Sequence, residues 1–273
     1  MTRLRIDDIA DIAKRLPQYD AQLTRQTGQT LKGVACHALG IRKEYYLSRA
    51  DRMKVSVVPF SCGHGVISEF AHTVAQIADY MGFAAFVTER GDVRGLADAF
   101  RRNADIIFMA DDRQFAAVNL HTRRVSDNGE MTARGFAAGL ELMVGGLKDR
   151  RVLVIGCGAV GRAAVRTLLT RGAEVAVYDV STAQSQELTT LMKGNVRIET
   201  DLPFALKHYH LLFDAAPAKN IITADAVSAR TFVAAPGMPC GVTPQAAEKL
   251  GRHLLHDPLQ IGVACMLADA VAR

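Results

Sequence analysis

The chain has 273 residues, 49% hydrophobic and 22% charged, which is typical of a folded globular protein of about two domains. Its 33 basic and 28 acidic residues are mixed along the sequence, and this balance argues against a nucleic-acid partner. Five cysteines without a Cys-x-x-Cys pair, and no apolar stretch of roughly 18 residues, predict a cytoplasmic protein with no membrane partner.

The first elements are expected to be helices. Apolar residues at helical spacing over residues 6–15 predict a short amphipathic helix that ends before Pro17, and a weaker helical stretch covers about residues 21–39. The charged segment 41–54 is typical of an exposed connection or a partly helical excursion.

Three apolar runs without polar alternation follow, joined by segments of helical periodicity. Such runs are typical of parallel strands buried on both faces and connected by right-handed crossovers. The strands are expected at residues 55–58, 83–87 and 105–110, and the helices at residues 66–81 and 93–102. We therefore predict a smaller N-terminal α/β domain with leading helices over residues 1–131.

A single helix is expected to link this domain to the rest of the chain. Thr132 has a side chain suited to a helix N-cap, and apolar residues from Phe136 to Leu147 fall on one stripe. We assign residues 132–150 to this linker helix and residues 151–273 to a C-terminal Rossmann dinucleotide-binding domain.

The Rossmann prediction comes from a glycine pattern in its full context. The apolar run 152–155 leads into GCGAVG at 156–161, a helix-forming stretch follows, and a second run, 174–178, ends at Asp179. The three glycines allow a tight turn, close approach of a pyrophosphate and close helix packing, while the helix N-terminus favours negative charge. Asp179 can accept the ribose hydroxyls and would repel a 2′-phosphate, so we expect NAD and not NADP.

Alternatives to this interpretation are a glycine turn that binds nothing and a site for a flavin or S-adenosylmethionine. Two later runs, 210–216 and 231–235, are expected to be strands whose following loops line the nicotinamide side. The expected cofactor contacts are Gly156, Cys157, Gly158, Ala159, Val160, Gly161, Asp179, Ala216, Pro217, Pro236 and Gly237.

Polar side chains follow two of the strands expected in the first domain. The segment PFSCGHG offers Ser61, Cys62 and His64, and MADDR offers Asp111 and Asp112. Carboxylates favour a cationic substrate, and one of them could stabilise the iminium that forms when an amine is oxidised. The alternatives are a surface-loop histidine, a cysteine without an evident partner, and aspartates that cap a helix.

A metal site is not expected. His208 and His210 form a His-x-His pair beside an apolar run, but no third ligand stands in register with them.

Taken in order, these motifs resemble the pyrrolysine synthase family. The glycine pattern is generic, whereas MADDR, PGMPC and PLQIG in this order are specific. The resemblance runs through LRIDDI (4–9), VPFSCGHGVI (58–67), IIFMADDRQF (106–115), VIGCGAVG (154–161), YD (178–179), AAPAKNII (215–222), APGMPCGV (235–242) and DPLQIGVACML (257–267).

The resemblance implies an NAD-dependent oxidation of the terminal amine of L-lysine-Nε-3-methyl-D-ornithine, a small amino-acid substrate. The imine would become an aldehyde with loss of ammonia and then close the pyrroline ring of pyrrolysine. The resemblance also implies that Asp111 contacts the reacting end of the ligand, that Leu4 and Ile9 lie in a lid helix, and that the protein is a homodimer. Another NAD-dependent amino-acid or imine dehydrogenase, or a non-catalytic NAD sensor, is the alternative.

Three features depart from the family pattern. His64 stands where an amide side chain is expected, Asp257 where a longer acid is expected, and the connection 42–54 is longer and more basic. We keep Asp257 among the expected cofactor contacts, and Ser61, Cys62 and His64 among the expected substrate contacts.

Overall fold

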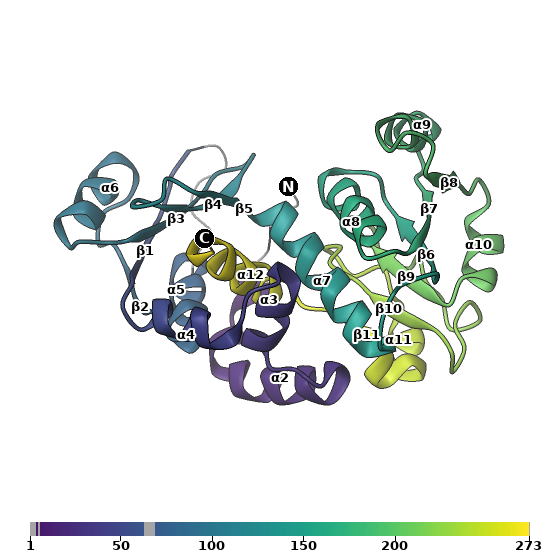
Figure 1. The fold of residues 1–273 in the computed structure, drawn as a ribbon, viewed down its shortest axis with the longest axis horizontal. Helices are drawn as coiled ribbons and strands as arrows, with labels where there is room; N and C mark the ends of the chain where they lie inside the picture. Colours follow the sequence, from purple (N-terminus) through teal and green to yellow (C-terminus); the bar gives the residue numbers. More distant parts are fainter. Residues whose placement is uncertain (1–3, 5, 63–68, 273) are drawn as a thin grey trace. The chain divides into compact units, whose positions relative to one another are not determined.

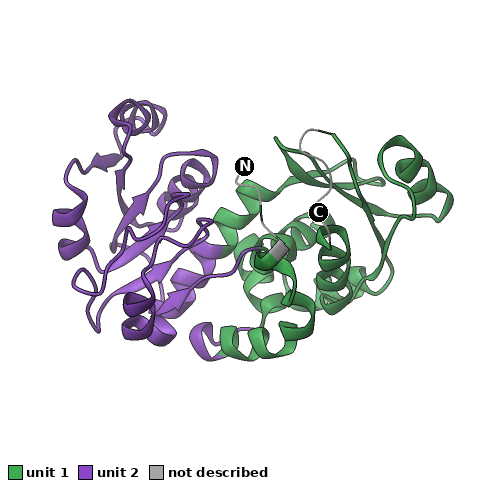
Figure 2. Cartoon of the chain, turned by 180° about the vertical axis from the view of Figure 1, so that it is seen from behind, with its two compact units in different colours: residues 1–24, 30–135, 259–273 green, residues 25–29, 136–258 purple. Residues whose placement is uncertain are grey.

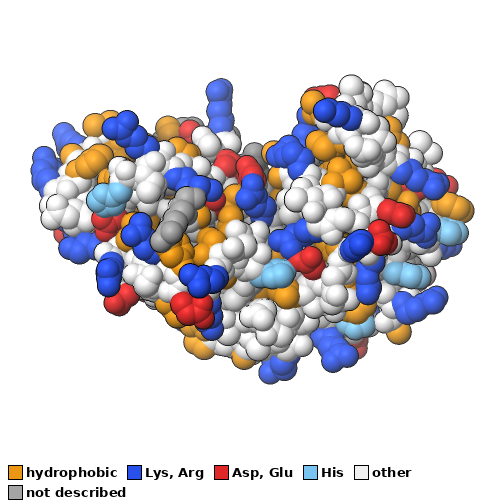
Figure 3. Space-filling model, viewed as in Figure 1, with side chains coloured by type: hydrophobic (Ala, Val, Ile, Leu, Met, Phe, Trp, Pro, Cys, Tyr) orange, Lys and Arg blue, Asp and Glu red, His pale blue; other side chains and the backbone are white. Residues whose placement is uncertain are grey.

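The structure is a computed structural model that describes residues 4, 6–62 and 69–272 (Figure 1). The chain folds into two compact units (Figure 2). Unit 1 comprises residues 1–24, 30–135 and 259–273, and unit 2 comprises residues 25–29 and 136–258. In the view of Figure 3, basic and acidic side chains are interspersed over the surface of both units.

Unit 1 is built on a five-stranded sheet in the order β2-β1-β3-β4-β5. Strands β1, β2 and β3 are parallel, as their uninterrupted apolar sequences predict. Strands β4 and β5 were not expected from the sequence, and both pair antiparallel. The strands are β1 (Lys54–Val58), β2 (Ala84–Val87), β3 (Ile106–Ala110), β4 (Phe115–Asn119) and β5 (Val125–Asp127).

Seven helices of the described chain lie wholly or mainly in unit 1. They are α1 (Ile6–Ile9), α2 (Ile12–Thr27), α3 (Leu31–Leu39), α4 (Lys43–Ala50), α5 (Phe70–Tyr80), α6 (Asp92–Arg101) and α12 (Gln260–Val271). The expected helix end before Pro17 is wrong, because α2 continues through this proline. Proline cannot donate one main-chain hydrogen bond of the helix, and the free energy gained by burying Leu16 and Leu23 offsets this loss. The predicted stretch 21–39 is divided at Thr30, whose hydroxyl caps α3.

Helix α12 ends the described chain and is buried along its whole length. Its residues are apolar except for Gln260 and Asp269, which is typical of a core helix. Two polar contacts fix it in unit 1: Asn119 Nδ2 donates to the Ala270 carbonyl at 2.8 Å, and the Arg124 guanidinium lies 2.6 Å from Asp269 Oδ1. Consequently the last helix belongs to unit 1, whereas the expected Rossmann domain ran to residue 273.

Helix α7 (Asn128–Val144) passes from unit 1 into unit 2. The expected N-cap at Thr132 is wrong, because the helix begins at Asn128 and Thr132 lies within it. The carboxylate of Asp127 accepts a hydrogen bond from the Glu130 N–H at 3.1 Å and satisfies one of the open donors of the first turn.

Unit 2 contains a six-stranded, fully parallel sheet in the order β11-β10-β9-β6-β7-β8. The chain steps outward in one direction from β6 and then in the other from β9, which is the doubly wound Rossmann order. The α/β class is therefore confirmed. The strands are β6 (Arg151–Ile155), β7 (Glu174–Tyr178), β8 (Val196–Ile198), β9 (Leu211–Asp214), β10 (Phe232–Ala234) and β11 (Leu254–Leu255).

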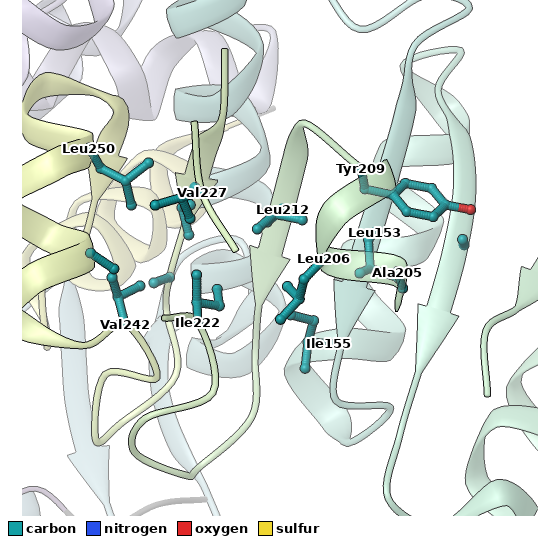
Figure 4. Packing of buried hydrophobic residues seen from close by; sticks show 14 residues of the cluster. Leu153, Ile155, Ala205, Leu206, Tyr209, Leu212, Ile222, Val227, Val242 and Leu250 are labelled. Carbon is teal, nitrogen blue, oxygen red and sulfur yellow. The ribbon is translucent and has the colours of Figure 1, made fainter. Parts of the chain in front are cut away.

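Helices cover this sheet and enclose an apolar core (Figure 4). The helices of unit 2 are α8 (Ala159–Thr170), α9 (Thr182–Leu191), α10 (Leu202–His208), α11 (Pro244–Leu250) and the short 3-10 turn η1 (Gly251–His253). Leu153 and Leu212 of adjacent strands pack with Leu206 of α10 and with Ile222 and Val242 from the loops after β9 and β10. This packing fixes the loops at the carboxyl end of the sheet.

Within the described residues, no helix is long and apolar enough to cross a membrane.

Candidate functional site

The turn between β6 and α8 holds glycines for steric reasons that the structure makes explicit. Gly156 has a φ of +93°, and a Cβ there would lie 3.0 Å from the Ala216 main-chain nitrogen. A Cβ on Gly161 would lie 1.8 Å from the Gly156 carbonyl oxygen, so only glycine allows α8 to approach the turn this closely. These contacts match two of the three roles predicted for the glycine pattern.

Gly158 differs, because a Cβ at this position would meet nothing within 4 Å. It is the N-cap residue of α8, it is exposed, and no side chain caps the helix there. Ala159 is also exposed and Val160 is half-buried. The first N–H groups of α8 therefore face open space and can bind an anion, which the helix dipole favours.

Asp179 lies at the carboxyl end of β7 and is tied to the glycine turn. Its Oδ2 accepts from the Cys157 N–H at 2.7 Å, and its Oδ1 accepts from the Ser181 N–H at 2.8 Å. The carboxylate keeps lone pairs for further donors, since each oxygen accepts more than one hydrogen bond. The Cys157 thiol is buried 3.8 Å from the Ser185 hydroxyl, and burial raises the pKa of the thiol.

The loops after β9 and β10 meet beside the glycine turn. The Gly237 N–H donates to the Asp214 carbonyl at 2.9 Å, and a Cβ on Gly237 would lie 2.4 Å from the Ala216 carbonyl oxygen. Pro217 is exposed and Pro236 is half-buried in the same loops. The residues expected on the nicotinamide side are therefore brought together at one end of the sheet.

Two acids lie beneath these loops. Asp257, an expected contact, is 4% exposed. Asp214, which the sequence reasoning missed, is fully buried, and burial raises its pKa to about 6 although the N–H groups of Ala216 and Gly241 and the charge of His256 act to lower it. Its Oδ1 accepts from Ala216 at 3.2 Å, while Oδ2 has no partner of good hydrogen-bond geometry. Its place as the last residue of β9 was the signal available in the sequence.

In unit 1, Asp111 begins the tight turn between β3 and β4. Its Oδ1 accepts from the N–H groups of Arg113 and Gln114, both at 2.7 Å. These N–H groups, that of Gln114 first, lower the pKa of the exposed Asp111 carboxyl. The alternative of an aspartate that caps a helix is wrong, because a strand follows this turn.

Ser61 and Cys62 follow β1 and are exposed. The Ser61 N–H donates to Asp92 Oδ1 at 2.8 Å and its hydroxyl to Asp92 Oδ2 at 2.6 Å, which lowers the pKa of Asp92. Asp92, at the start of α6, therefore fixes the orientation of Ser61, and the sequence reasoning missed this contact. His64 lies outside the described residues.

The two loops of unit 1 leave the same edge of the sheet. Val58, the last residue of β1, pairs in parallel register with Met109 of β3, so residues 59–62 and 111–114 follow neighbouring strand ends. Leu4 is half-buried, whereas Ile9 in α1 is 1% exposed and packs inside unit 1. The polar candidates are thus together at one edge, and Ile9 presents little surface to a ligand.

Comparisons with known proteins agree with this architecture. Residues 8–126 match the family described as pyrrolysine biosynthesis protein PylD, N-terminal domain, and residues 128–244 match the alanine dehydrogenase/PNT C-terminal domain. A pyrrolysine synthase of Methanosarcina acetivorans is 32% identical over 268 residues, which cover 98% of each chain. One of Methanosarcina barkeri is 32% identical over 269 residues, covering 98% of this chain and 97% of that protein.

The chain belongs to the pyrrolysine synthase family. The resemblance seen in the motifs is thereby confirmed. Because the chain also contains a dehydrogenase-type domain, it is an oxidoreductase of pyrrolysine biosynthesis. Quinate dehydrogenase from Corynebacterium glutamicum, solved in complex with NAD, superposes with a TM-score of 0.54 at 14% identity, covering 80% of this chain and 93% of that one. This likeness concerns the fold.

Proposed function

We propose that this protein is a pyrrolysine synthase that uses NAD to oxidise the terminal amine of L-lysine-Nε-3-methyl-D-ornithine. One observation carries the proposal: in a member of this family, the α8 N-terminus is open behind the glycine turn, with Asp179 at the end of the adjacent strand. We further propose that the protein acts in the cytoplasm as a homodimer. Light scattering of the purified protein checks the oligomeric state.

The residues of unit 2 fit a dinucleotide. The N–H groups at the start of α8 would hold the pyrophosphate, where Gly158 leaves space, and Asp179 would accept the ribose hydroxyls. Ala216, Pro217, Pro236 and Gly237 would border the nicotinamide half, with Asp257 beneath them. When bound, NAD accepts a hydride from the carbon that carries the amine.

Asp111 is assigned to the substrate amine. Its lowered pKa keeps the carboxyl ionised at neutral pH, so it can bind the ammonium and stabilise the positive charge of the iminium. A carboxylate with a lowered pKa is a weak base, so we propose that the ammonium loses its proton to water before the hydride leaves, and that Asp111 acts electrostatically on the iminium that forms. Because Oδ1 is used by the turn, we propose that Oδ2 faces the ligand.

The later steps are the chemistry of the oxidised substrate. Water adds to the iminium, ammonia leaves, and the resulting aldehyde condenses with the ornithine α-amine with loss of water. Ser61, fixed by Asp92, and its neighbours Cys62 and His64 are proposed to hold the substrate, with Leu4 contributing an apolar contact. Ile9 is 1% exposed and is assigned to the packing of unit 1 in place of the substrate.

Purified protein incubated with NAD and the synthetic amide tests this function. We expect NADH absorbance to rise and a product to appear with the mass that follows loss of ammonia and ring closure. L-Alanine and L-ornithine serve as controls, because turnover of either in place of the amide would indicate a different amino-acid dehydrogenase. No NADH and no product would end the proposal.

Asp179→Ala is expected to weaken NAD binding about tenfold and to relax the preference for NAD over NADP, since the ribose hydroxyls lose a charged acceptor.

A further inference from the structure

The guanidinium of Arg162 lies near the acid proposed to bind the ribose. Arg162 is the fourth residue of α8, and its Nε donates to the Cys157 carbonyl at 3.0 Å. The N–H of the same cysteine donates to Asp179 Oδ2 at 2.7 Å. The main-chain nitrogen and oxygen of one residue lie within about 4 Å of each other, so a cation stands less than about 10 Å from the Asp179 carboxylate.

Glu187 of α9 binds the other side of this guanidinium. Its Oε1 accepts from Arg162 Nη1 at 2.7 Å, and its Oε2 accepts from Nη2 at 2.8 Å. A bidentate pair of this kind is strong for a side-chain contact and fixes the plane of the guanidinium. The hydrogen bonds between the partners raise the pKa of Arg162 and lower that of Glu187, so both are ionised at neutral pH. Every nitrogen of the guanidinium therefore already has an acceptor.

A 2′-phosphate on the ribose would need a cation in this region. Where the same glycine pattern binds NADP, an arginine near the ribose accommodates this phosphate. Residues 179–191, all of them described, include no Lys or Arg, and Arg166 is about 6 Å farther along α8 than Arg162. Arg162 is thus the cation best placed for the phosphate, and Glu187 neutralises it.

We propose that Glu187 is a specificity-determining residue: its bidentate ion pair with Arg162 denies the 2′-phosphate of NADP a cationic partner. The inference rests on the proposed NAD site of unit 2. The two acids then act by different means, because Asp179 would accept the ribose hydroxyls, whereas Glu187 occupies the cation that a phosphate would need. A pair that only braced α8 against α9 would affect stability and leave the ratio of the two dinucleotide affinities unchanged.

The test is calorimetric titration of the purified, full-length protein with NAD and, separately, with NADP, without substrate. Glu187→Gln keeps one oxygen that can accept from Arg162 but removes the negative charge. We expect Kd for NADP to fall about tenfold, as when one charge-assisted hydrogen bond is gained, and Kd for NAD to change less than about twofold. Asp179→Ala would relax the preference in another way, by weakening NAD.

Two further variants separate the freed cation from other causes. Arg162→Gln/Glu187→Gln removes both charges and should abolish the gain in NADP affinity. Glu141→Gln is the matched control, because Glu141 pairs with Arg171 at the opposite end of α8, about 13 Å along the helix from Arg162. This control should leave both Kd values unchanged.

Two results would overturn the inference: an unchanged ratio of the two Kd values in folded Glu187→Gln, or the same gain for NADP in the double variant. Circular dichroism reports folding. Should Glu187→Gln not fold, Arg162→Gln decides, since it leaves the Glu187 charge unpaired and should raise Kd for NADP more than Kd for NAD; equal changes would contradict the inference.

The outcome can be told apart from that of the proposed function. If the unmodified protein binds neither dinucleotide, the proposed NAD site is wrong and this inference falls with it. If the unmodified protein binds NAD more tightly than NADP and Glu187→Gln leaves the ratio unchanged, only the role of Glu187 is wrong.

Discussion

The turn after β6 in unit 2 and the loops after β1 and β3 in unit 1 present binding groups in different ways. In the turn after β6 the main chain is the proposed binding element, and close contacts with other main-chain atoms determine the residues at Gly156 and Gly161. In the loops of unit 1 the side chains are the proposed binding elements, and Asp111 and Asp92 hold their orientation through N–H and hydroxyl donors. Filling the space around the glycines should therefore disrupt the turn after β6, whereas removing a carboxylate charge should disrupt the loops of unit 1.

Removing the charge of Asp111 should have the largest effect. Asp111→Asn keeps the Oδ1 that accepts from Arg113 and Gln114, but it cannot stabilise a cation. We expect kcat to fall about 100-fold or more, as when a preorganised electrostatic partner is lost, with NAD affinity unchanged. Steady-state kinetics and calorimetric NAD titration measure both quantities. The control is Asp112→Asn at the neighbouring exposed position, and equal losses in the two variants would contradict the role of Asp111.

Adding one methyl group should have different effects at Gly161 and at Gly158 in the turn after β6. Gly161→Ala places a Cβ against the Gly156 carbonyl, and we expect the free energy of unfolding to fall by about 3 kcal/mol. Gly158→Ala should leave the free energy of unfolding nearly unchanged, because its Cβ meets nothing, but should weaken NAD about tenfold by occupying the space for the pyrophosphate. Denaturant unfolding and NAD titration of both variants test this, and a similar loss of stability in both would show that Gly158 is not open.

The glycine turn could be predicted from the sequence because its constraints are local. The strand, the turn, the helix and the acid at position 179 are consecutive, and each residue type has a steric or electrostatic reason that needs no distant partner. The parallel strands of unit 1 could also be predicted, because their apolar runs are uninterrupted. Even the positive φ of Gly156 follows from the turn alone.

Other features depend on contacts that the sequence does not display. The turn at Asp111 looked like a helix start because an aspartate bonded to N–H groups two and three residues ahead occurs both in turns and at N-caps. Its partner strands β4 and β5 are short, and their pairing decides the structure. A helix as apolar as α12 must be buried, but the unit that buries it is decided by tertiary contacts, among them those of Asn119 and Arg124.

The free energy of unfolding should depend on pH through the buried carboxyl of Asp214. Burial raises the pKa of Asp214 to about 6 in the folded state, above its unfolded value, so the folded protein binds this proton more tightly and loses stability as pH rises from about 4 to about 6. Asp214→Asn cannot ionise. We expect the free energy of unfolding of the unmodified protein, relative to this variant, to decrease by about 2 kcal/mol between about pH 4 and pH 7. Urea unfolding across this range gives the difference, and parallel pH profiles would contradict the assignment.

The smallest effect is expected at Asp92, which acts on the substrate only through Ser61. Asp92→Asn keeps an oxygen that can accept from the Ser61 N–H, and asparagine tolerates the φ of +53° found there, but the charge that orients the hydroxyl is lost. Because the pair is exposed, we expect KM for the amide to rise about threefold with kcat unchanged. Asp98→Asn, at an acid of α6 that pairs with Arg90 and Arg101, is the matched control and should change neither constant. A fall in kcat in Asp92→Asn would mean that the Ser61 loop contributes to the reaction step and not only to substrate binding.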